Sequence, residues 1–159
     1  MTRIAPCLWY HEDAIAAAEF YAATIPDSRI DRISDQNADS PGGKAGSVQT
    51  VEFTVAGTPL YAFSAPGPDK FNLAASLMIE CDSQEQVDAL WDALSEGGQT
   101  MECGWLQDRW GLMWQIIPPG MLDLMAADDR QAAGRAAAKM LTMKKLDGPA
   151  IQRAFDGVE

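Results

Sequence analysis

The residues best suited to binding chemistry lie in one short stretch, CGWLQDRWGLMWQIIP (residues 103–118), which holds three of the five tryptophans. Asp108 and Gly111 are typical of a turn, and the apolar run after them is typical of a strand. Gln115 in that run can donate and accept hydrogen bonds, while Trp105 can either form an apolar wall or only pack. We treat Trp105 and Gln115 as candidate ligand-binding residues.

A second set of candidates comes from AASLMIEC, residues 74–81, which has the composition of a strand. Strand alternation puts Ser76, Met78 and Glu80 on one face. A carboxylate among apolar neighbours can have a raised pKa and act as a base. Glu80 is therefore a candidate catalytic residue, with Ser76 and Met78 as candidate ligand-binding residues. Glu52, inside another strand-like run, is a second possible base.

Cysteine and histidine chemistry is sparse. Cys103 could be a reactive thiolate beside a pocket, but no histidine lies near it in sequence, so a buried inert thiol is the alternative. We keep Cys103 among the candidate ligand-binding residues. His11, the single histidine, follows an expected strand and is predicted to lie at the surface. Cys7 is expected to face the following helix.

Bulk composition narrows the class of partner. Twelve basic and twenty-three acidic residues give a net charge of −11, which disfavours nucleic acid and anionic lipid as partners. No apolar run is long enough to span a bilayer, and no signal peptide is apparent. The three cysteines are far apart and form no zinc-type pair, which predicts reduced thiols in a cytoplasmic protein. Small molecules or proteins remain as partners.

Hydrophobic periodicity predicts alternating strands and helices. The first helix, residues 14–25, follows a possible N-cap at Asp13, and the second carries Val87, Leu90 and Trp91 at helical spacing after a capping box. Ala56-Gly57 separates two extended runs, as in a hairpin. The expected strands are residues 4–10, 29–34, 48–55, 58–64, 74–81, 99–105 and 112–117.

The order of these elements repeats, which predicts a single α+β domain built from two βαβββ modules. The first module spans residues 1–66 and the second residues 67–120. A helical tail, residues 121–159, contains one helix from Asp128 to about Met143 and a short one from Asp147. We expect this tail to serve packing or dimer contacts.

Four segments carry a family resemblance: EFYAATIPDSRI (19–30), FNLAASLMIEC (71–81), the tryptophan-rich stretch quoted above, and MLTMKKLD (140–147). Together they resemble the PhnB-like branch, also labelled 3-demethylubiquinone 3-methyltransferase-like, of the vicinal oxygen chelate superfamily of glyoxalase, bleomycin resistance and dioxygenase proteins. The resemblance implies two curved sheets forming a cup that holds a ligand, usually in a homodimer.

The resemblance also implies where a metal would bind. The positions that supply ligands in metal-dependent members fall here on Pro6, Ser76 and Gln115. Proline has no side-chain donor atom, and neutral hydroxyl and amide oxygens are weak ligands for a divalent ion. We therefore expect no metal and no other cofactor. The alternative is a divalent metal recruited through unconventional ligands.

Three functions remain open. The leading hypothesis is metal-independent binding of an aromatic metabolite or toxic compound. The alternatives are a metal-dependent lyase, isomerase or dioxygenase, and a protein that docks a partner through its acidic surface and C-terminal helices. A methyltransferase is unsupported because the glycine cluster, residues 42–46, lies in a polar loop and not between a strand and a helix.

Overall fold

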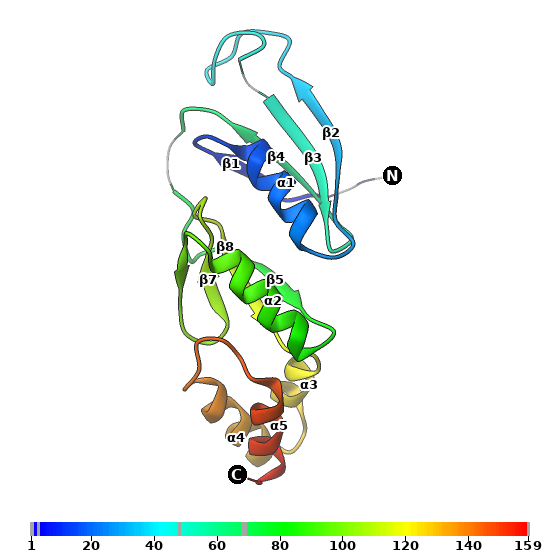
Figure 1. Cartoon of the computed structure of the whole chain (residues 1–159), viewed down its shortest axis with the longest axis vertical. Helices are drawn as coiled ribbons and strands as arrows, with labels where there is room; N and C mark the ends of the chain where they lie inside the picture. The colour runs from blue at the N-terminus through cyan, green and yellow to red at the C-terminus, as the bar shows by residue number, and fades with distance from the viewer. Residues whose placement is uncertain (1, 3, 48, 68–69, 159) are drawn as a thin grey trace. The chain divides into compact units, whose positions relative to one another are not determined.

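The computed structural model describes residues 2, 4–47, 49–67 and 70–158. The chain divides into two compact units, Met1–Lys70 and Phe71–Glu159 (Figure 1). The division falls a few residues after the expected module boundary, and the C-terminal helices belong to the second unit.

The first unit is a four-stranded mixed sheet with one helix on it. Its sheet order is β1-β4-β3-β2, in which β1 runs parallel to β4 and the other neighbours are antiparallel. The β3–β4 hairpin turns at Ala56-Gly57, both with positive φ, as the sequence predicts. In chain order the elements are β1 (Cys7–Tyr10), α1 (Ala14–Thr24), β2 (Arg29–Asp35), β3 (Gln49–Val55) and β4 (Thr58–Ser64).

The core of this unit lies between α1 and the sheet. Small side chains let the helix approach closely, with Ala17 and Ala18 fully buried, and Tyr21 stacks on Phe53 with ring centroids 6.5 Å apart. The hydroxyl groups of Tyr10 and Tyr21 lie 3.2 Å apart and share a hydrogen bond, so these buried phenols are satisfied.

The start of α1 differs in detail from the prediction. Asp13 is the N-cap residue, but its backbone is left-handed, with φ of 65°, and its side chain caps nothing. The Ala14 N–H donates instead to Ser64 Oγ on β4, at 2.8 Å. A cap supplied from a distant strand has no local sequence pattern, so sequence reasoning could not find it.

The second unit repeats the arrangement with shorter strands. Its sheet order is β5-β8-β7-β6, with β5 parallel to β8 and the other neighbours antiparallel. The expected strand 99–105 is two strands separated by a turn. In chain order the elements are β5 (Leu77–Glu80), α2 (Gln84–Ser95), β6 (Gln99–Thr100), β7 (Trp105–Gln107) and β8 (Met113–Ile117).

Helix α2 matches its prediction closely. The buried residues are Val87, Leu90, Trp91 and Leu94, the stripe seen in the sequence. Ser83 Oγ accepts from the Gln86 N–H at 3.2 Å, and Gln86 Oε1 accepts from the Asp82 N–H at 2.8 Å. This reciprocal capping fixes where the helix begins.

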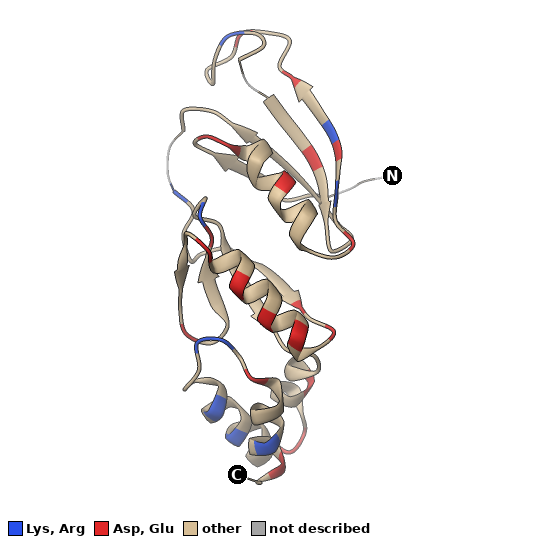
Figure 2. Ribbon diagram, in the orientation of Figure 1, with Lys and Arg blue, Asp and Glu red and all other residues tan. Residues whose placement is uncertain are grey.

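Three helices follow β8: α3 (Met121–Ala126), α4 (Arg130–Met140) and α5 (Gly148–Asp156). The sequence predicts the last two helices and misses the six-residue α3. The side chain that caps α4 is that of Asp129, one residue after the expected Asp128, and Asp147 caps α5. Their apolar faces form a small core together with Ile117 of β8. Acidic residues lie along α2, whereas the charged residues of α4 are basic (Figure 2).

Candidate functional site

The open face of the second sheet brings together most of the predicted binding residues. In the strand register Met78 on β5 lies beside Gln115 on β8, and Gln115 lies opposite Trp105 on β7. Register partners project from the same face of a sheet. Met78 is 50% exposed, and Trp105 and Gln115 are half-buried, so this row can be reached from solvent.

Gln115 is held in a fixed orientation. Its Nε2 donates to Ser76 Oγ at 2.8 Å, across the two parallel strands. No hydrogen bond from a described residue reaches its amide oxygen, which can therefore accept from a ligand. Ser76 in turn keeps its hydroxyl hydrogen as a donor. The pair offers one acceptor and one donor, both uncharged, next to the Trp105 ring.

Cys103 lies apart from this row. It belongs to the turn between β6 and β7, with a positive φ of 59°, and its N–H donates to the Met143 carbonyl at 2.7 Å. Its side chain is half-buried. The backbone of Cys103 thus has a clear structural role in anchoring the tail.

Glu80 shares the face of Ser76 and Met78, as predicted, but it ends the strand. Its Oε1 accepts from the Gly120 N–H, at 3.2 Å, where the chain turns into α3. A carboxylate near the first N–H groups of a helix is well placed electrostatically. The contact that the structure gives Glu80 is therefore one that shapes the end of the face.

Asp108 builds the connection that positions β8. It is 3% exposed, and its Oδ1 accepts from the N–H groups of Trp110 and Leu112 at 2.9 and 3.0 Å. Its Oδ2 accepts from Trp114 Nε1 at 2.9 Å. Because Trp114 is fully buried toward α2, this bond fixes the strand so that Gln115 projects to the open face.

The first sheet has a comparable face that the sequence analysis misassigned. Cys7 and Trp9 alternate with the buried Tyr10, so both project away from α1, and Cys7 is exposed. The prediction that Cys7 faces the helix is wrong. Its parity was counted from Pro6, whereas the buried Tyr10 sets it.

Trp9 is the main feature of this first-sheet face. Its ring lies 5.1 Å from that of Phe63, and its Nε1 donates to the Ala65 carbonyl at 3.0 Å. A Cβ added at Gly67 would meet Trp9 Nε1 at 2.5 Å, so glycine permits this close packing. Counting four residues back from Asp13 and from Asp82, which lie in the two strand–helix connections, gives Trp9 as the counterpart of Met78.

Charges on the first-sheet face are paired. Arg32 and Glu52 form an ion pair, and this raises the pKa of Arg32. A carboxylate already bound to a guanidinium is a poor general base, because accepting a proton would break the pair. The Cys7 thiol on the same face has a raised pKa through partial desolvation, which keeps it protonated near neutral pH.

Metal-binding geometry is missing from the described ranges. Among residues 2, 4–47, 49–67 and 70–158, no three His, Cys, Asp or Glu side chains come close enough to hold an ion. Separately, none of the helices among the described residues is long and apolar enough to cross a membrane.

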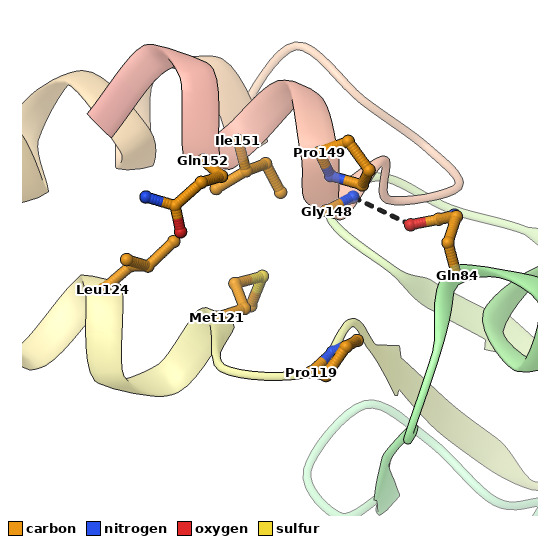
Figure 3. Close-up of a pocket in the computed structure, with 8 residues that line it drawn as sticks. All are labelled: Gln84, Pro119, Met121, Leu124, Gly148, Pro149, Ile151 and Gln152. Atoms are coloured by element: carbon orange, nitrogen blue, oxygen red, sulfur yellow. Dashed lines mark hydrogen bonds between the residues drawn. The ribbon is translucent and has the colours of Figure 1, made fainter. Parts of the chain in front are cut away.

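A separate hollow of about 240 Å³ lies between the start of α2, α3 and α5 (Figure 3). Its wall is mainly apolar, from Pro119, Met121, Leu124 and Ile151. Gln84 at its edge already uses its amide, since Oε1 accepts from the Gly148 N–H at 2.9 Å. None of the predicted site residues lines it.

Comparison with known proteins assigns the family. A sequence model described as 3-demethylubiquinone-9 3-methyltransferase matches residues 2–117. The chain belongs to this PhnB-like family. The family resemblance drawn from the sequence is thus confirmed. No curated protein matches the chain.

Solved structures with the same fold confirm the fold of this PhnB-like chain. A PhnB protein from Bacillus cereus is 24% identical, with a TM-score of 0.63 over 74% of this chain and 99% of its own. A Pseudomonas aeruginosa protein is 19% identical, with a TM-score of 0.59 over 75% and 98%. The fosfomycin resistance protein FosX from Listeria monocytogenes, solved with Mn(II) and sulfate, is 13% identical, with a TM-score of 0.52 over 72% and 89%. The predicted α+β fold of two βαβββ modules is confirmed.

Proposed function

We propose that the chain binds a small, partly aromatic organic molecule on the open face of the second sheet, without a metal ion. The observation that carries the proposal is the row of Met78, Gln115 and Trp105 in direct register, with Gln115 fixed by Ser76. An accessible apolar surface with a few oriented polar groups is the usual make-up of a small-molecule site.

The donor set on this face supports a metal-independent mode. Ser76 offers a hydroxyl and Gln115 an amide, and the carboxylate of Glu80 already accepts from the Gly120 N–H. A catalytic zinc or iron site normally uses three histidine or carboxylate ligands. FosX from Listeria shares the fold and was solved with Mn(II). Ser76, Gln115 and Glu80 of this chain do not suit such an ion.

Catalysis of methyl transfer is not part of this proposal. Neither the β1–α1 connection, His11-Glu12-Asp13, nor the β5–α2 connection, Cys81-Asp82-Ser83, contains a glycine. Both sheets are mixed and four-stranded. A nucleotide-fold methyltransferase relies on a glycine-rich turn beside a parallel sheet.

We also propose that the protein is a cytoplasmic homodimer. The cytoplasmic location is supported by the three cysteines, which form no disulfide.

The test combines a thermal-shift screen of aromatic metabolites with isothermal titration of the compounds that raise the melting temperature. Gln115→Leu should weaken binding of such a compound about five- to tenfold, or about 1–1.4 kcal/mol, because the amide no longer orients its polar group. Gln131→Leu, the same change on exposed α4, should leave the Kd unchanged.

Elemental analysis of the freshly purified protein tests the other half of the proposal. A content of zinc, iron, manganese or nickel well below one ion per chain is expected. Stoichiometric metal would overturn the metal-independent mode in favour of a lyase, isomerase or dioxygenase. A flat thermal-shift screen would overturn small-molecule binding and favour docking of a protein.

A further inference from the structure

The C-terminal tail follows the part of the chain that the family model matches. The family match ends at Ile117, and α3, α4 and α5 all follow it. The Bacillus cereus PhnB protein is covered over 99% of its length by only 74% of this chain. The tail therefore lies beyond the matched βαβββ core, although its segment 140–147 is one of the four that carry the family resemblance.

The tail is fixed to the second unit from two sides. On one side, the N–H groups of Cys103 and Gly104 donate to the carbonyls of Met143 and Lys144, at 2.7 and 2.8 Å. On the other side lies Gln84 at the start of α2. Its Nε2 donates to the Leu146 carbonyl at 3.0 Å, and its Oε1 accepts from the Gly148 N–H at 2.9 Å. Residues 143–148 thus bridge the two sides.

Leu146 closes the junction. Its side chain is fully buried in the cluster that contains Ile117, Met121 and Ile151. A Cβ added at Gly104 would lie 2.8 Å from Leu146 Cδ1 and 2.8 Å from the Ile116 carbonyl oxygen. Only glycine leaves room for this side chain, so the turn before β7 and the tail fit each other closely.

The position of Ile117 gives the tail a consequence for binding. Ile117 lies two residues beyond Gln115 on β8, on the same face and about 7 Å farther along the strand. It is only 2% exposed because the tail covers it. The usable part of the face therefore ends just past Gln115.

We propose that the C-terminal tail is a fixed end wall of the binding face, and that Leu146 limits the length of the ligand that fits beside Gln115. This inference rests on the proposed function of that face. The Glu80 contact with Gly120 belongs to the same boundary, since it holds the turn that leads from β8 into α3.

The experiment compares two phenols of different length by titration calorimetry: 2-naphthol, whose two rings are fused, and the longer 4-phenylphenol, whose two rings are joined end to end by a single bond. Leu146→Ala should tighten binding of 4-phenylphenol at least about threefold relative to 2-naphthol, because truncation opens space next to Ile117. Gln84→Leu loosens the tail without emptying its core and should change the ratio in the same direction. Lys145→Ala, which loses exposed ion pairs with Asp88 and Asp92, is the matched control and should keep the wild-type ratio.

Hydrogen exchange of the Cys103 and Gly104 amides provides the structural readout, and both should exchange faster in Leu146→Ala and Gln84→Leu. If exchange accelerates while the probe ratio stays within about twofold of wild type, the end wall does not select ligand length and the inference is wrong. In that case 2-naphthol binding would still support the proposed function. If no variant binds either probe, both proposals fail.

Discussion

Asp108 and Cys81 are both buried in the second unit, and they tolerate burial for opposite reasons. Asp108 keeps a carboxylate inside by accepting three N–H groups, one of them from the Trp114 ring. Charge-assisted bonds of this kind offset the loss of water. Cys81 is suited to burial as a neutral thiol. Desolvation, with a smaller contribution from the charge of Asp82, raises its pKa to about 11.

The raised pKa of Cys81 predicts a loss of stability in alkaline solution. The folded protein prefers the protonated thiol, so this contribution is complete below pH 9.0 and is lost as the pH rises through about 11. The free energy of unfolding should fall by about 1–3 kcal/mol over this window through Cys81 alone. Urea unfolding at pH 8.5 and at pH near 11 measures it.

Lysines and tyrosines titrate in the same range, so the quantity to follow is a difference between two proteins. The stability of the wild type minus that of Cys81→Ala should shrink as the pH rises. A difference that stays constant from pH 8.5 to about 11 would contradict the raised pKa.

Helix starts in this protein use local and distant caps. Ser83 and Gln86 cap α2 within four residues, and their spacing is visible in the sequence. For α1 the candidate at the right position, Asp13, makes no side-chain cap, and Ser64 on β4 takes that role. The two modules therefore have the same order of elements, but their helices are capped in different ways.

This difference yields a prediction for the first unit. Ser64→Ala should lower the free energy of unfolding by about 1 kcal/mol, because the Ala14 N–H loses its acceptor in a half-buried place. Asp13→Asn tolerates the left-handed backbone and should change stability by less than about 0.5 kcal/mol. Denaturant unfolding measures both variants; a Ser64→Ala protein as stable as the wild type would contradict the role of Ser64 as the cap.

At the scale of the whole molecule, the net charge of −11 governs association. Two copies of so acidic a chain repel each other at low ionic strength, and salt screens that repulsion. The exposed Trp9, on the open face of the first sheet, provides apolar surface for a second copy to cover.

We predict a homodimer in solution, with an association that strengthens as salt is added. Light scattering on a size-exclusion column should give twice the mass of one chain, and the dimer fraction at low protein concentration should rise with sodium chloride. The mass of a single chain across the micromolar range, at low and high salt alike, would be incompatible with this prediction.

Local pattern was sufficient for several parts of this protein. The stripe Val87, Leu90, Trp91 and Leu94, the hairpin at Ala56-Gly57 and the βαβββ order could all be read in advance, because each depends on residues near one another in the chain. The same holds for the shared face of Ser76, Met78 and Glu80, which follows from strand alternation alone.

Tertiary contacts decided the rest. That Gln115 is bound by Ser76, that Glu80 holds Gly120, and that Ser64 caps α1 depend on register between strands far apart in sequence. The side of the sheet from which Cys7 projects is set by the buried Tyr10, and counting from Pro6 gave the wrong side. Which residues lie beside each other on a sheet is fixed by pairing and packing across the fold, and no local spacing carries that information.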